Sequence, residues 1–235
     1  MRGRCPLLKR FISRPFLDCV QMRPHVIVNC AMTADGKIAG RSRRQIRISS
    51  PEDMERVKSL REECEAILVG VNTILADDPH LTVKGMSLEE SPLRIVLDSK
   101  GRTPAGAKVL DGRACTLIAT STSCTRTWPG AEVVRIGEDL IDLHELMKEL
   151  EARNVQRLMV EGGGETIWSF FKAGLVDEYR VFVGSKVLGG RTAPSPVDGE
   201  GFDDDGGVGL HLKGTEILGD GVLLCYEVIR DVPPA

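Results

Sequence analysis

The chain has 235 residues, of which 42% are hydrophobic and 28% charged, a composition typical of a globular protein rather than a disordered one. Its 31 basic and 34 acidic residues give a net charge of −3, so nucleic acid is not expected as a partner. No apolar run approaches the ~20 residues that a membrane-spanning helix needs, and no membrane association is expected.

Seven cysteines are scattered singly along the chain, with no Cys-x-x-Cys pair and no histidines clustered beside them. A zinc site needs several converging ligands at regular spacings, so no metal is expected. Thiols spaced this irregularly are typical of reduced cysteines, which favours a cytoplasmic protein.

The N-terminal residues differ from the rest in charge. Residues 1–23 contain six basic residues against one acidic residue. We expect this segment to be a basic extension outside the fold, and residues 24–235 to form a single domain. An Arg-rich, acid-poor start can be a transit peptide, and translation that begins at Met22 is the alternative.

From residue 24 onward, strands and helices are expected to alternate. The β-branched run 25–32 predicts a strand that ends at the Asp-Gly turn of residues 35–36. A helix begins at Pro51 with Ser50 as its N-cap. Arg61 is expected at the edge of the apolar stripe of this helix. The stripe consists of Met54, Val57, Leu60 and Cys64.

The remaining chain predicts further short strands and two more long helices. Strands are expected at 66–70, 93–98, 115–120, 132–136, 157–161 and 179–184. One helix is capped by Asp142 and runs to about Arg153, and another follows the glycines at 162–164 and buries Ile167, Phe170, Phe171 and Gly174. Residues 210–218 and 222–229 read as a hairpin. This order predicts an α/β fold, with a mixed, mainly parallel sheet flanked by helices and a C-terminal antiparallel hairpin.

A run of three glycines, Gly162 to Gly164, lies where a strand meets a helix. Glycines at such a junction let backbone N–H groups approach a phosphate, and the helix dipole favours an anion there. A tight turn that merely requires positive φ is the equally weighted alternative. The dinucleotide fingerprint G-x-G-x-x-G does not occur in the sequence, so an ordinary Rossmann site is excluded.

Residues 70–79 (GVNTILADDP) predict a short helix that ends in two acids before a proline. Asn72 or Thr73 is the expected cap. Asp77 and its neighbour could do acid–base chemistry or bind ribose hydroxyls. Carboxylates at a helix C-terminus oppose the helix dipole, so stability alone does not favour them and function is preferred.

Two cations and one long loop complete the candidates. Arg61 and Lys84 are candidate phosphate donors by charge alone, with solvated surface positions as the alternative. Residues 191–207 form a polar loop rich in Gly and Pro, and loops of this length are often functional or mobile.

Five ordered stretches together resemble one family, the riboflavin-biosynthesis reductases. They are MTADGK at 32–37, the stretch from LVG to DDPHLTV at 68–83, RIVLDS at 94–99, EGGG at 161–164 and GLVDE at 174–178. The family is that of the stand-alone 2,5-diamino-6-ribosylamino-4(3H)-pyrimidinone 5′-phosphate reductase, similar to the reductase half of the bifunctional deaminase–reductase.

This resemblance implies a dihydrofolate-reductase-like fold, a homodimer and a small-molecule substrate. It also implies hydride transfer from NADPH, with NADH as the alternative donor, to C1′ of the ribosyl imine to give the ribitylamine. The cofactor carries the hydride, so the protein mainly supplies position and electrostatics. A pterin or folate reductase on the same fold and a non-catalytic nucleotide-binding regulator are the alternatives.

The resemblance also implies roles for individual residues. The expected catalytic residues are Asp77 and Glu161. The expected substrate contacts are Arg61, Leu81, Lys84 and Glu161. The expected cofactor contacts are Ala31, Thr73, Asp77, Ser99, Gly162, Gly163, Gly164, Glu165 and Thr166.

Two stretches depart from the family pattern. Many relatives have Thr directly after the glycines, where this chain has Glu165 before Thr166. A carboxylate would repel a pyrophosphate, so Glu165 is expected to turn outward and to use only its N–H. Residues 41–47 are variable in type, and roles for Gln45 and Arg47 are left open.

Overall fold

A computed structural model of the chain describes residues 23–44, 46–203 and 206–230. The expected basic extension lies outside these residues except for Arg23, its last member. The Arg23 guanidinium forms two hydrogen bonds of 2.9 Å with the carboxylate of Asp177, so this side chain contacts the domain.

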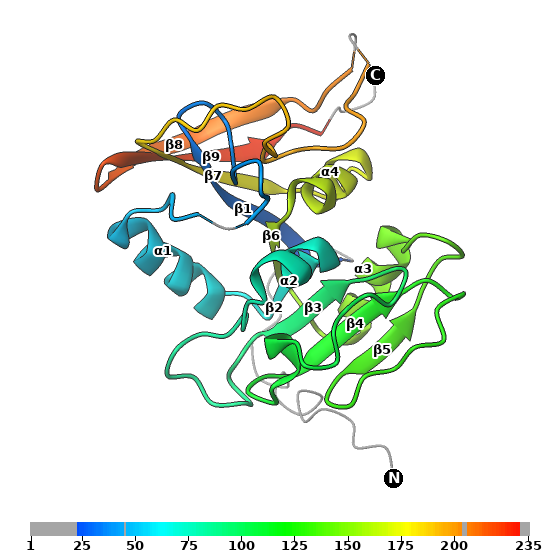
Figure 1. Ribbon diagram of the computed structural model, residues 1–235. Helices are drawn as coiled ribbons and strands as arrows, with labels where there is room; N and C mark the ends of the chain where they lie inside the picture. Colours follow the sequence, from blue (N-terminus) through cyan, green and yellow to red (C-terminus); the bar gives the residue numbers. More distant parts are fainter. Residues whose placement is uncertain (1–22, 45, 204–205, 231–235) are drawn as a thin grey trace, which may run out of the picture.

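A nine-stranded sheet forms the centre of the described part of the chain (Figure 1). Its strands lie in the order β5-β4-β3-β2-β6-β1-β7-β9-β8. All neighbours from β5 to β7 pair in parallel, whereas β9 pairs antiparallel with β7 and β8. The predicted mixed, mainly parallel sheet with a C-terminal antiparallel hairpin is therefore confirmed. The strands are β1 (His25–Thr33), β2 (Ala66–Gly70), β3 (Leu93–Leu97), β4 (Thr116–Thr120), β5 (Glu132–Arg135), β6 (Arg157–Gly162), β7 (Glu178–Gly184), β8 (Leu210–Leu218) and β9 (Gly221–Val228).

Helices cover both faces of the sheet. They are α1 (Pro51–Glu62), α2 (Val71–Asp77), α3 (Leu143–Ala152) and α4 (Gly164–Lys172), with a short 3₁₀ helix η2 (Lys108–Leu110). Successive side chains of a strand point to opposite faces. Val26 and Leu68 accordingly pack with α3 and α4, whereas Ile67 packs with α2 and Ile27 with α1. The sheet is thus the middle layer between the pair α3 and α4 and the pair α1 and α2.

Two of the three predicted helix caps are confirmed and one is wrong. The Ser50 side chain accepts a hydrogen bond from the third residue of α1, and the Asp142 side chain caps α3. Helix α2 instead begins directly after β2 with Gly70 at the cap position, where no side-chain cap forms. Asn72 lies inside α2, and its Oδ1 accepts a hydrogen bond of 3.0 Å from Arg102 instead.

Two residues that were predicted on the buried faces of helices, Met54 and Gly174, are exposed instead. Met54 is 55% exposed, and Asp53, not Met54, lies buried beneath α1. The carboxylate of Asp53 pairs with Arg56 under the helix. The other members of the expected stripe, Val57, Leu60 and Cys64, pack against the sheet as predicted. Gly174 is exposed rather than buried, because it lies beyond the end of α4 in the left-handed region, with φ of 64°.

Among the five cysteines in the described part of the chain, four follow the expected chemistry and one does not. Cys30, Cys64, Cys124 and Cys225 carry free thiols, whereas Cys115 is disulfide-bonded. Burial raises the pKa of both Cys30 and Cys64 to about 12, so both thiols stay protonated. Across the described residues, no three potential metal ligands come together, and no helix is long and apolar enough to cross a membrane.

Candidate active site

A cleft of about 2220 Å³ opens beside the carboxyl ends of β2, β3 and β6. The side of α1 and the first turns of α2 and α4 form its walls. In parallel sheets these strand ends are the usual place for ligands, because the loops that leave the strands meet there. The residues assigned from the sequence all line this one cleft. They are Ala31, Arg61, Thr73, Asp77, Leu81, Lys84, Ser99 and residues 161–166.

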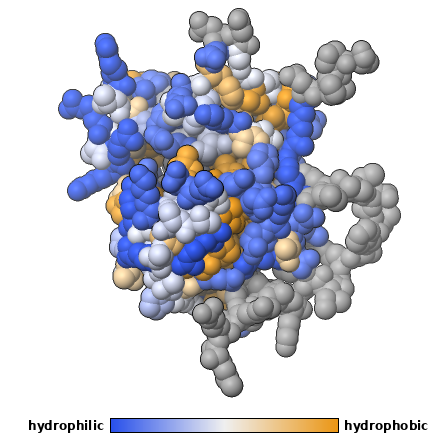
Figure 2. All heavy atoms as spheres, turned by 90° about the vertical axis from the view of Figure 1, so that its right-hand side faces the viewer, coloured by the Kyte–Doolittle hydropathy of each residue, from blue (hydrophilic) through white to orange (hydrophobic). Residues whose placement is uncertain are grey.

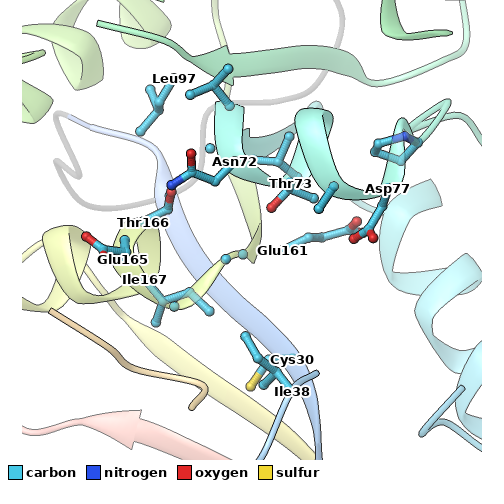
Figure 3. A pocket seen from close by; sticks show the side chains of 18 of the residues that line it. Cys30, Ile38, Asn72, Thr73, Asp77, Leu97, Glu161, Glu165, Thr166 and Ile167 are labelled. Carbon is cyan, nitrogen blue, oxygen red and sulfur yellow. The ribbon is translucent and has the colours of Figure 1, made fainter. Parts of the chain in front are cut away.

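Two carboxylates and one guanidinium meet in the middle of the cleft. Glu161 lies near the end of β6, and Asp77 is the last residue of α2. Figure 3 shows their carboxylates directed toward each other. The guanidinium of Arg61, on α1, donates from Nε to Glu161 Oε1 at 2.6 Å and from Nη2 to Oε2 at 2.7 Å. Three residues that are far apart in the sequence thus form one charged group.

The ion pair modifies the role expected for Arg61. The attraction of Glu161 raises the pKa of Arg61 despite its partial burial, so this guanidinium stays charged. The side chain of Glu161 is only 12% exposed and that of Arg61 26%, so the pair is shielded from water. Arg61 Nη1 also donates to the carbonyl of Thr82 at 3.4 Å. Arg61 therefore approaches a ligand as the cationic half of an ion pair, whereas Lys84 lines the cleft with an exposed side chain.

The glycine run leaves space at the start of α4. This helix has no side-chain cap, in contrast to α1 and α3. A Cβ atom on Gly162 would meet nothing within 4 Å, and one on Gly163 would meet only Thr73 Oγ1 at 3.6 Å. Uncapped N–H groups at a helix N-terminus favour an anion. The first two glycines therefore leave room for a phosphate to approach the backbone.

Gly164 serves a different purpose. A Cβ atom there would come within 2.6 Å of the Ser195 carbonyl oxygen. The backbone N–H of Asp198 also donates to the Gly164 carbonyl at 3.2 Å. This glycine is required for close packing of the loop that precedes β8, and a substitution would disturb that packing.

Thr166 packs against Gly70 at the end of β2, whereas Glu165 is exposed. Thr166 Oγ1 lies so close to β2 that a Cβ on Gly70 would come within 2.2 Å of it, so Gly70 allows α4 to approach the start of α2. Glu165 lines the cleft with an exposed side chain, whose carboxylate lies apart from those of Asp77 and Glu161 (Figure 3).

The sequence did not identify every residue that lines the cleft. Pro194, Asp198 and Gly199 close one side of it, and the Pro194 carbonyl accepts a hydrogen bond of 3.0 Å from the backbone of Ile38. The length and the Gly and Pro content of residues 191–207 indicated a functional or mobile loop, but not this contact. Arg102 also lines the cleft, and no motif identified it.

The variable stretch before α1 also reaches the cleft. Arg43 and Arg47 line it. Gln45, whose role was left open, lies outside the described residues.

Comparison with known proteins identifies the family. The RibD C-terminal domain family matches residues 24–224. A Methanothermobacter thermautotrophicus protein named 2,5-diamino-6-ribosylamino-4(3H)-pyrimidinone 5′-phosphate reductase is 44% identical over 215 residues, 88% of this chain and 99% of that protein. An Archaeoglobus fulgidus protein of the same name is 45% identical over 195 residues, 77% of this chain and 89% of that protein.

Solved structures support the same fold. A deaminase/reductase from Thermotoga maritima superposes with a TM-score of 0.76 at 24% identity, and the match covers 88% of this chain and 57% of that one. This chain therefore spans little more than half the length of the bifunctional protein. The Saccharomyces riboflavin biosynthesis reductase Rib7 superposes with a TM-score of 0.72 at 22% identity, covering 91% of this chain and 93% of that one. With these matches, the chain belongs to the RibD C-terminal domain family.

Proposed function

We propose that this chain is an oxidoreductase that reduces 2,5-diamino-6-ribosylamino-4(3H)-pyrimidinone 5′-phosphate to its ribitylamino product in riboflavin biosynthesis. The observation that carries the proposal is that one cleft contains both the uncapped start of α4 and the carboxylates of Asp77 and Glu161. The first can hold a dinucleotide phosphate, and the second can serve proton transfer. The names of the two archaeal relatives describe the same reduction.

NADPH is the proposed hydride donor, and the described residues fit it. The space above Gly162 and Gly163 admits a phosphate against the backbone, with Thr73 beside Gly163, and Ser99 also lines the cleft. Lys100 also lines the cleft after the end of β3, where a cation suits the additional phosphate that distinguishes NADPH from NADH. When bound, NADPH supplies the hydride, so the chain itself has to orient the substrate and deliver a proton.

The reduction consumes one proton, so a residue of the cleft has to donate it. When a hydride adds to C1′ of the ribosyl imine, a C–H bond forms, the electron pair of the C=N bond moves to nitrogen, and nitrogen takes up one proton. Asp77 is the proposed proton donor. Glu161, whose charge is compensated by Arg61, is the proposed substrate ligand.

The substrate's 5′-phosphate is proposed to bind at the α1 side of the cleft. Arg61 and Lys84 line that side, and a chain with a net charge of −3 offers a dianion no general attraction. Of the five N–H groups of the Arg61 guanidinium, two bond to Glu161 and one to the carbonyl of Thr82. Its remaining donors are the ones proposed to reach phosphate oxygens.

A homodimer is proposed from the shape of the C-terminal hairpin. Strand β8 is at the edge of the sheet and is exposed along nearly its whole length. Ile217 is 79% exposed and lies opposite Val222, which is also exposed. The turn that joins β8 to β9 lies at the left of Figure 1, on the side opposite to the face that Figure 2 shows. Uncovered apolar edge strands tend to pair with another chain, and sedimentation of the purified protein measures the result.

The purified protein tests the proposed reaction directly. It is mixed with NADPH and the ribosylamino substrate, the absorbance of the reduced nicotinamide is followed, and the product is identified by mass spectrometry as the substrate plus two hydrogens. Turnover of a dihydropterin or dihydrofolate but not of the ribosylamine would favour the pterin reductase. Nucleotide binding without turnover of either compound would favour the regulator.

A further inference from the structure

The segment that joins α2 to β3 brings two proposed substrate contacts to the cleft without secondary structure of its own. Residues 78–83 of this segment belong to no helix or strand. Leu81 and Lys84 nevertheless line the cleft. The position of this substrate segment, residues 80–84, must therefore be set by side chains from elsewhere in the fold.

The first anchor is Arg94, the second residue of β3, whose side chain is completely buried. Its Nη1 donates to the backbone carbonyl of His80 at 3.1 Å and to Asp111 Oδ1 at 2.9 Å. Its Nη2 donates to the Ala114 carbonyl, and its Nε to Thr116 Oγ1 at 3.0 Å. A buried guanidinium is tolerated only when its donors are satisfied, so these contacts hold one another in place.

Asp111 extends the anchor to the side chain of His80. Its Oδ2 lies 2.9 Å from His80 Nδ1, while its Oδ1 accepts from Arg94. Burial of Asp111 opposes ionisation, but hydrogen bonds from Arg113, Arg94 and His80 outweigh it and lower its pKa to about 2. The carboxylate of Asp111 therefore stays charged. It links the guanidinium of Arg94 to the side chain of His80, whose backbone carbonyl accepts a hydrogen bond from the same guanidinium.

The second anchor lies on the other side of Leu81. The side chain of Leu81 is buried in the core cluster that contains Val109 and Trp128, and its backbone has φ of 50°. The next carbonyl, that of Thr82, accepts the hydrogen bond from Arg61. Arg94 thus holds the segment just before Leu81, and Arg61 holds it just after Leu81. The loss of either contact should shift the backbone from which the Lys84 side chain extends.

We propose that Arg94 is a positioning residue for the pyrimidine substrate, acting through Asp111 and His80 on the substrate segment. The inference rests on the proposed substrate contacts of Leu81 and Lys84. Arg94 lies at the amino end of β3 and the cofactor residue Ser99 follows its carboxyl end, roughly 16 Å away at the rise of an extended strand. A displaced substrate segment should therefore affect the substrate and leave the nucleotide site in place.

The test compares Arg94→Met with a control variant that removes a buried side-chain hydrogen bond elsewhere in the sheet. Arg94→Met removes the donors but keeps an apolar stem. Thr120→Val removes the hydrogen bond of 3.4 Å from the buried Thr120 hydroxyl to the Val134 carbonyl and leaves the contacts of Arg94 in place. Arg94→Met should raise the KM for the ribosylamino substrate about tenfold or more, with the KM for NADPH changed less than about twofold. Arg94→Lys should recover part of the loss. Thr120→Val should lower the melting temperature without raising the substrate KM.

Each other outcome has a definite meaning. If Thr120→Val raises the substrate KM as much as Arg94→Met does, or if the KM for NADPH rises equally, the effect is general destabilisation and the inference fails. If Arg94→Met does not fold, Asp111→Asn takes its place with the same expected KM pattern, and an unchanged substrate KM overturns the inference. Lys84→Ala tests the proposed substrate contact separately from the positioning role of Arg94. If this variant leaves the substrate KM unchanged, the proposed contact of Lys84 with the substrate is wrong, whatever the result for Arg94.

Discussion

Replacing Asp77 by asparagine tests the proposed proton donor with almost no change in side-chain size. Asp77 ends α2 and its carboxylate faces that of Glu161 (Figure 3). An acid at a helix C-terminus is disfavoured by about 0.3–1 kcal/mol, because its charge opposes the helix dipole. The free energy of unfolding should therefore stay the same or rise by up to about 1 kcal/mol. For a chain of this length, that is an increase of at most roughly 4 °C in melting temperature.

The effect on turnover should be much larger than the effect on stability. General acid catalysis contributes about 10²- to 10⁴-fold to rate, so kcat should fall by at least about 10²-fold. The assay follows consumption of reduced nicotinamide at saturating substrate, beside a thermal unfolding curve of the same preparation.

Asp78→Asn is the matched control. It removes the same charge from the neighbouring position, where the carboxylate accepts a hydrogen bond of 2.8 Å from the backbone of Lys108. An asparagine amide can accept that bond too, and asparagine tolerates the left-handed backbone of this residue, with φ of 43°. Its kcat should stay close to that of the unmodified protein.

Three results would contradict this reasoning about Asp77. A clear drop in the melting temperature of Asp77→Asn would show that the carboxylate supports the fold. An equal loss of kcat in both variants would point to a general charge effect at the end of α2. An unchanged kcat in Asp77→Asn would assign the proton to another group.

Three further predictions follow from the cleft and the chain. Gly163→Val should fold, since a Cβ there meets only Thr73 at 3.6 Å, and it should bind NADPH more weakly in a fluorescence titration. Gly164→Ala should instead lose stability. An unchanged NADPH affinity in Gly163→Val would contradict phosphate binding at this turn. Arg61→Ala should raise the KM of the phosphorylated substrate about tenfold, because charge-assisted hydrogen bonds contribute roughly 1.5–3 kcal/mol each. A dephosphorylated substrate should lose less, and equal losses would argue against the phosphate contact. A chain begun at Met22 should keep its melting temperature and activity, and a large loss of either would show that the preceding residues matter.

Local sequence signals sufficed for the strands, for most of the helices and for their order. The β-branched run of β1, the cap at Ser50 and the cap at Asp142 act over a few residues, so their effect is readable along the chain. The hairpin at the C-terminus was predictable for the same reason, because a Gly-Asp-Gly turn joins two strands directly. The resemblance to a family then indicated which of these positions line the site.

The pairing of charges across the fold was not readable in this way. Arg61 was expected as a phosphate donor, and its bond to Glu161 joins positions 100 residues apart. The same holds for Arg94, whose place in the predicted strand 93–98 did not indicate its contact with His80. The burial of Asp53 on α1, in place of Met54, likewise depends on the residues that lie beneath the helix.

The difference has one physical cause. Hydrophobic periodicity, caps and turns depend on neighbours within a few residues, so the amino-acid sequence specifies the elements and their order directly. The contact between Arg61 and Glu161 exists because α1 packs across the sheet beside the end of β6, and that distance is set by the packing of the whole core. The sequence therefore specified the parts of the site, and the three-dimensional packing determined which charges neutralise one another within it.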